Sequence, residues 1–131
     1  MFGNKKAGVG PIESLIGSGT VVEGNIRFKG GLRIDGEVLG SVSVADGGAG
    51  ALVVSELGRV RGPVHAHHLV VNGTIEGPVQ SDEVLELQPK AKILGNVRYR
   101  SLEMHPGAII EGALAPLDND RPALKLAVNK D

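Results

Sequence analysis

The sequence predicts an all-β solenoid, a parallel β-helix of about six coils, from three observations. A five-residue phrase of the form aliphatic-x-Gly-x-aliphatic recurs six times within 131 residues. A second phrase, aliphatic-x-aliphatic, lies between successive copies of the first. The composition agrees with a repeat fold, because 20 glycines and only three aromatic residues suit many tight corners and a thin aliphatic core.

The first phrase is expected to form one corner of each coil. Its glycine either needs a positive φ or has no room for a Cβ atom. The six central glycines are Gly24, Gly40, Gly62, Gly77, Gly95 and Gly112. Their spacings of 16, 22, 15, 18 and 17 residues do not fit the strict six-residue register of a left-handed hexapeptide helix. The longest interval contains DGGAGA at 46–51, which we interpret as a loop insertion at a corner.

The second phrase adds further strands to each coil. The last full repeat illustrates this with alternating apolar residues at Ile93, then Val97 and Tyr99, then Leu102 and Met104. Alternation with a period of two over so few residues indicates strands. Three strands of about five residues therefore make one coil, and successive coils stack about 4.8 Å apart.

The domain boundaries follow from where the repeats begin and end. We expect a flexible tail at 1–11, the β-helix at 12–117 and a second flexible tail at 118–131 that serves as a spacer or partner-binding segment. No apolar run is long enough for a transmembrane span or a signal peptide. The absence of cysteine is compatible with a cytoplasmic location, and a net charge of −1 gives no attraction to nucleic acid.

Catalytic and cofactor motifs are not predicted. The glycines match neither a dinucleotide fingerprint nor a P-loop, and no serine lies in a nucleophile elbow. The histidines His65, His67 and His68 are expected on a solvated strand face, so neither a metal nor a cofactor is assigned. Arg61 and Glu76 occupy the same corner position in neighbouring coils and are interpreted as a charge pair.

Some apolar residues fall at outward positions. By alternation these are Leu39, Val53, Val70 and Leu94. Val53 and Val70 share a register on successive coils and should touch. They are candidates for a lateral patch, and the alternative is an ordinary β-branched strand surface.

The two ends of the solenoid are the main candidate site. A terminal coil exposes unpaired backbone groups and the ends of its aliphatic columns, and neither end carries a clear cap. Subunits are therefore expected to stack end to end through Leu15, Ile16, Ile110, Leu114 and Leu117. The alternative is that short apolar segments fold over the ends and close them.

The order of the repeat phrases resembles the bactofilins, the polymer-forming cytoskeletal proteins of bacteria. The resemblance covers about residues 12–115 and is carried by IESLIGSGTVVEGNIRFKGGLRIDGEVLGSVSV at 12–44 and by the repeats at 77–114. It implies a right-handed, three-faced β-helix that forms non-polar filaments without nucleotide and scaffolds cell-wall, cell-shape or other localised proteins.

The resemblance also extends to the first residues of the chain. Met1, Phe2, Lys5 and Lys6 resemble the membrane-targeting start of some bactofilins, which implies a position at the inner face of the cytoplasmic membrane. One Phe can insert into a bilayer and two Lys can attract anionic lipid. The alternative function is that of a β-helix enzyme acting on polysaccharide or in acyl transfer.

Overall fold

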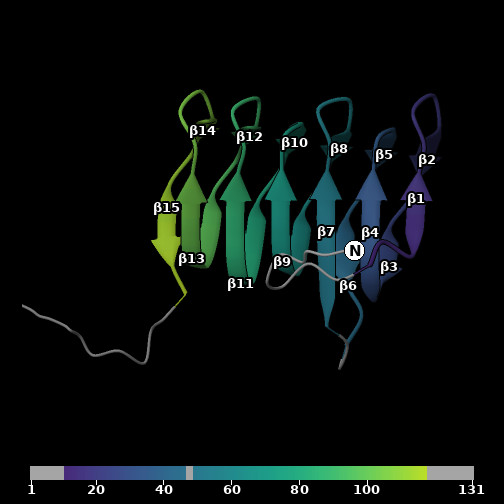
Figure 1. Cartoon of the computed structure of the whole chain (residues 1–131), viewed down its shortest axis with the longest axis horizontal. Coiled ribbons are helices and arrows are strands. Elements are labelled where there is room, and N and C mark those ends of the chain that lie inside the picture. Colours follow the sequence, from purple (N-terminus) through teal and green to yellow (C-terminus); the bar gives the residue numbers. More distant parts are fainter. Residues whose placement is uncertain (1–10, 47–48, 118–131) are drawn as a thin grey trace, which may run out of the picture.

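The protein is a parallel β-solenoid of six coils, which confirms the predicted fold class (Figure 1). The structure is a computed structural model, and it describes residues 11–46 and 49–117. Every strand pair in these two ranges is parallel. The coils follow one another along the long axis, from β1 at one end to β15 at the other.

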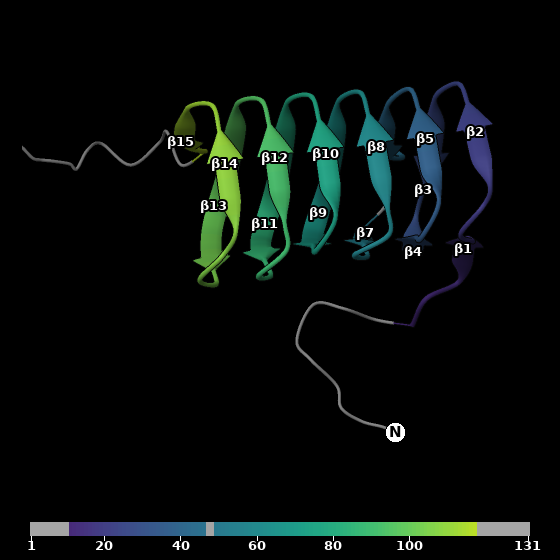
Figure 2. The same ribbon diagram turned by 90° about the horizontal axis from the view of Figure 1, so that it is seen from above.

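One face of the solenoid is a six-stranded sheet, whose strands lie side by side in Figure 2. Each of its strands has three residues and comes directly before one of the corner glycines. They are β2 (Val21–Glu23), β5 (Glu37–Leu39), β8 (Arg59–Arg61), β10 (Thr74–Glu76), β12 (Lys92–Leu94) and β14 (Ile109–Glu111).

The other two faces belong to one nine-stranded sheet that continues around a corner. The second face contains β3 (Ile26–Phe28), β6 (Val42–Val44), β15 (Leu114–Pro116) and the first parts of β9 (Val64–Val71), β11 (Val79–Leu87) and β13 (Val97–Met104). The third face contains β1 (Ser14–Ile16), β4 (Gly30–Ile34), β7 (Gly50–Val54) and the second parts of β9, β11 and β13. The prediction that all strands have about five residues is wrong. Sharp corners limit the strands of the first face to three residues, whereas β9, β11 and β13 continue through the gentler corner between the second and third faces.

The core consists of aliphatic columns that run along the solenoid axis. The column on the first face contains Val22, Val38, Val60, Ile75, Ile93 and Ile110. That on the second face contains Ile26, Val42, Val64, Val79, Val97 and Leu114. On the third face one column contains Ile16, Ile34, Val54, Val71, Leu87 and Met104. Residues of the middle coils are buried, whereas the last residue of each column meets no further coil.

The corner between the second and third faces contains a bulge in β11. The register shifts between Ser81 and Val84 relative to both neighbouring strands, so β11 has an extra residue there. Ser81 is fully buried, and the single proton of its hydroxyl is shared between the carbonyl oxygens of Val84 at 2.8 Å and His67 at 3.1 Å. A polar residue in the core is thus satisfied by carbonyl groups of the corner.

The predicted insertion at 46–51 is shorter than expected. Gly50 and Ala51 are the first residues of β7 and are buried. An added Cβ at Gly50 would contact the side chains of Phe28 and Val44 at 2.8 Å, so this position belongs to the packed interior. Because β7 pairs with β4 and β9, the stack of coils continues past the interruption.

Candidate self-assembly site at the ends of the solenoid

Three strands lie open at each end of the solenoid. At the N-terminal end these are β1, β2 and β3, and at the C-terminal end they are β14, β15 and the second part of β13. Each set contains one strand from every face, so the two ends present the same three-sided outline. In the part of the chain that the structure describes, no strand pairs with the outer edges of these sets. Unpaired edges of this kind are templates for adding another chain.

Large exposed apolar side chains gather at these same ends. Seven are exposed in the described ranges, and all but Leu57 lie on or beside a terminal coil. The six are Ile12, Leu15, Val21, Met104, Ile109 and Leu114. An apolar surface confined to the two ends is what stacking of subunits would cover.

At the N-terminal end, the two predicted residues play different roles. Ile16 ends a core column and packs against the buried cluster. Leu15 pairs with Arg33 on the outer surface and is 60% exposed, so it borders the end without completing the core. Val22 and Ile26 end the columns of the other two faces, and neither was predicted as an interface residue. Both residues are aliphatic positions of the first copy of the repeat phrase, and this placement would have identified them.

At the C-terminal end, Ile110 and Leu114 complete core columns as the register requires. Leu114 is 47% exposed although its partner Val97 is fully buried, because no coil follows it. Leu117 is half-buried, and its N–H donates to the carbonyl of Tyr99. Met104 also ends a column and is exposed, but it was not predicted.

The six corner glycines form a ladder along one edge of the solenoid. All six have a positive φ between 132° and 158°. At the last five, an added Cβ would contact the backbone carbonyl of the corner glycine in the preceding coil. Gly24 is the exception, because nothing lies within 4 Å of its added Cβ. The position of the missing Cβ therefore faces the N-terminal end in every coil, and at Gly24 no preceding coil fills the space that it faces.

Asparagine side chains connect neighbouring coils beside this ladder. Asn25 Oδ1 accepts from the N–H of Ser41 at 3.0 Å, and Asn96 Oδ1 accepts from the N–H of Ala113 at 3.0 Å. The equivalent residues of two middle coils are Pro63 and Pro78, which have no N–H to satisfy.

The four outward apolar residues do not form a single surface. Val53 and Val70 pair in register on the third face. Leu39 and Leu94 lie on the first face, where Arg61 and Glu76 separate them.

The Arg61–Glu76 pair is accompanied by a second arginine. Glu76 contacts Arg61 at 3.3 Å and Arg59 more closely, at 2.7 Å. Its hydrogen bond with Arg59, helped by Arg61, lowers the pKa of Glu76. Two arginines on one carboxylate join neighbouring coils on the surface of the first face.

The histidines are arranged differently from the expectation. His65 and His67 face Asp82 through Nε2, at 2.8 and 3.7 Å from its Oδ2. His68 is only 7% exposed, and its Nδ1 has no hydrogen-bond partner among the described residues. The prediction of a solvated face is therefore wrong for His68, which continues the inward alternation of Val64 and Ala66 along β9.

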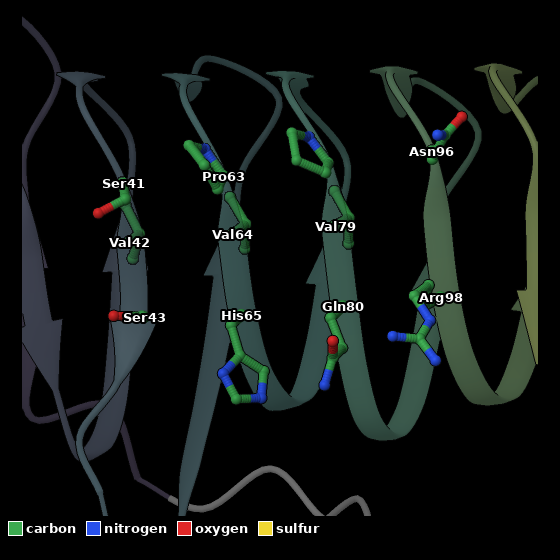
Figure 3. A pocket seen from close by; sticks show the side chains of 11 residues that line it. Ser41, Val42, Ser43, Pro63, Val64, His65, Val79, Gln80, Asn96 and Arg98 are labelled. Carbon is green, nitrogen blue, oxygen red and sulfur yellow. The ribbon is translucent and has the colours of Figure 1, made fainter. Parts of the chain in front are cut away.

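A shallow groove of about 440 Å³ lies on the second face. Figure 3 shows Ser43, His65, Gln80 and Arg98 following one another on successive coils, with Pro63 beside the corner ladder. The residues that line it include no carboxylate, so they provide no acid–base pair.

Across residues 11–46 and 49–117 the structure has no helix long and apolar enough to cross a bilayer. Met1, Phe2, Lys5 and Lys6, the predicted membrane-binding residues, lie outside the described residues, as do 47–48 and 118–131.

Comparisons with known proteins agree with one another. Residues 14–115 match the family model described as "Bactofilin: Polymer-forming cytoskeletal". Bactofilin BacO of Myxococcus xanthus (strain DK1622) is 24% identical over 99 residues, which is 76% of this chain and 75% of BacO. The solid-state NMR structure of the cytoskeletal bactofilin BacA superposes with a TM-score of 0.69 at 30% identity, over 80% of this chain and 96% of BacA.

Proposed function

Since this chain belongs to the bactofilins, a family of polymer-forming cytoskeletal proteins, we propose that it polymerises end to end through its terminal coils into non-polar filaments, without nucleotide. We further propose that these filaments lie on the inner face of the cytoplasmic membrane and scaffold cell-wall, cell-shape or other localised proteins. The bactofilins are a structural family, so the alternative of a β-helix enzyme is set aside.

The observation that carries the end-to-end proposal is that six of the seven large exposed apolar residues in the described ranges lie on or beside a terminal coil. Stacking at the ends would extend the core columns and would pair the open strand edges in one step. A non-polar filament needs two joints, one between two N-terminal ends and one between two C-terminal ends. Each joint then brings a surface against a copy of itself, as two-fold symmetry requires.

A charge at one end tests this arrangement. Leu114→Arg places a guanidinium in a joint that excludes water, where an unpaired charge costs several kcal/mol. We expect folded dimers that are joined through the remaining N-terminal joint, measured by light scattering and electron microscopy. The matched control is Leu57→Arg, because Leu57 is exposed in the middle of the solenoid and should tolerate arginine without loss of filaments. Normal filaments from Leu114→Arg would place the interface elsewhere, with the outward Val53–Val70 surface the next candidate.

The membrane proposal is supported by the composition of the first residues. Phe2 is apolar, and Lys5 and Lys6 each add about 1 kcal/mol of attraction to an anionic surface. A single tail binds weakly, but a filament carries many tails and gains affinity from avidity. Either deletion of residues 1–8 or Phe2→Glu should release filaments from anionic liposomes in co-sedimentation while leaving polymerisation intact. Unchanged co-sedimentation of both variants would refute membrane binding by this tail.

A further inference from the structure

Two carboxylates and an imidazole converge on the outer surface of the third face. Glu86 of β11 and Glu103 of β13 are paired in register on neighbouring coils. His105 follows β13 directly, and its Nε2 lies 3.2 Å from Glu86 Oε2 and 4.0 Å from Glu103 Oε2. The three ligand atoms all lie within 4.8 Å of one another. None of these residues lines the groove on the second face.

Among the described residues, no lysine or arginine balances the carboxylates of this cluster. Two carboxylates in register on adjacent strands repel each other, and the side chain of Glu86 is only 19% exposed. In the described ranges neither Glu86 nor Glu103 forms an ion pair with a lysine or an arginine. Glu86 and Glu103 both face His105, and the amide of Gln88 lies 3.5 Å from Glu86 Oε2. A cation held between the carboxylates would remove the repulsion.

We propose that Glu86, Glu103 and His105 bind a divalent transition-metal ion of the zinc class. Imidazole and carboxylate are both zinc ligands, whereas calcium and magnesium prefer oxygen ligands alone. With bonds of about 2.0–2.1 Å, ligand atoms of a tetrahedral zinc site lie about 3.3 Å apart. The 3.2 Å between His105 and Glu86 already matches that spacing. Glu103 must approach His105 by less than 1 Å, and its exposed side chain permits this movement.

The position of the site gives the ion a structural role. Glu86 belongs to the coil before the last, whereas Glu103 and His105 belong to the last coil, so the ion fastens these two coils together. It lies beside the strand edge that the proposed C-terminal joint uses. Binding itself does not depend on that joint, and it is measurable whether or not the protein forms filaments.

The test is metal loading of the full-length protein. After treatment with chelator, the protein is dialysed against micromolar Zn²⁺ and the zinc bound per chain is measured. We expect one zinc per chain, and at least about tenfold weaker binding for His105→Ala and for Glu103→Gln. The matched control is His65→Ala, because the side chain of His65 is as exposed as that of His105 and also contacts a carboxylate.

Each result decides the proposal. Full loading of His65→Ala together with loss of zinc from His105→Ala supports the site. Absence of zinc from the wild type, equal loading of His105→Ala, or loss of zinc from His65→Ala overturns it. Circular dichroism shows whether each variant is folded, and Glu103→Gln adds a conservative change at a side chain that is 64% exposed.

Discussion

His68 is a buried histidine, and burial favours the neutral form of its imidazole. Burial lowers the pKa of its imidazole, against the opposing attraction of Glu86 and Glu83. Below about pH 6.5 this imidazole binds a proton more readily in the unfolded chain than in the folded chain. Lowering the pH therefore lowers the free energy of unfolding. We therefore expect the melting temperature to fall between pH 7.5 and pH 5.5, and to fall less in His68→Leu.

The neighbouring His67 provides the comparison for this prediction. It is more exposed, and its Nδ1 accepts from the N–H of Gly50 at 3.1 Å. His67→Ala leaves His68 and its burial in place and should still form filaments. If His68→Leu lost as much stability in acid as the wild type does, the burial of His68 would not be the cause.

At the scale of the element, the corner glycine allows neighbouring coils to approach each other at their observed spacing. Gly95 has a φ of 155°, and an added Cβ would meet the carbonyl of Gly77 in the coil below. Gly95→Ala should therefore combine about 1–3 kcal/mol of backbone strain with a steric clash and lower the melting temperature strongly. Gly17→Ala is the control, because Gly17 has no positive φ and nothing lies within 4 Å of its added Cβ. Equal melting temperatures for the two variants would contradict this account of the corner.

The corner also shows what could be predicted from sequence. The glycine phrase predicted the sharp corner between the first and second faces in every coil, because φ and the approach of the preceding coil are both local consequences of the repeat. The gentler corner could not be predicted, since no residue type marks it. The bulge in β11 depends on its register with β9 and β13.

Part of the candidate site could be predicted because the repeat phrase marks its residues. Ile110 and Leu114 were identified because the last phrase continues the columns. Leu15 stays a predicted interface residue, but it lies on the outer surface, because the polar Ser14 is the residue in register with the buried Leu32 in the first coil. The pairing of Glu86 with Glu103 does have a sequence signal, since the phrases LEL at 85–87 and LEM at 102–104 repeat the glutamate.

At the scale of the whole molecule, the direction of the glycine ladder distinguishes the two ends. In every later coil the added Cβ points to the preceding coil, so at Gly24 it projects beyond the N-terminal end. A subunit stacked there at the usual strand distance of about 4.8 Å would lie in the path of that methyl group. Gly24→Ala should therefore weaken the N-terminal joint while adding no clash within its own subunit.

The expected result for Gly24→Ala is a folded protein that no longer forms filaments. Strain from its φ of 132° will lower the melting temperature, so a second variant is needed that leaves the backbone unstrained. Val21→Arg serves this purpose, because Val21 lies on the same end and is 53% exposed. Each variant should stop at dimers that are joined through their C-terminal ends, and combining either with Leu114→Arg should give monomers in analytical ultracentrifugation. Filaments of normal length from both Gly24→Ala and Val21→Arg would mean that the first coil does not take part in the joint.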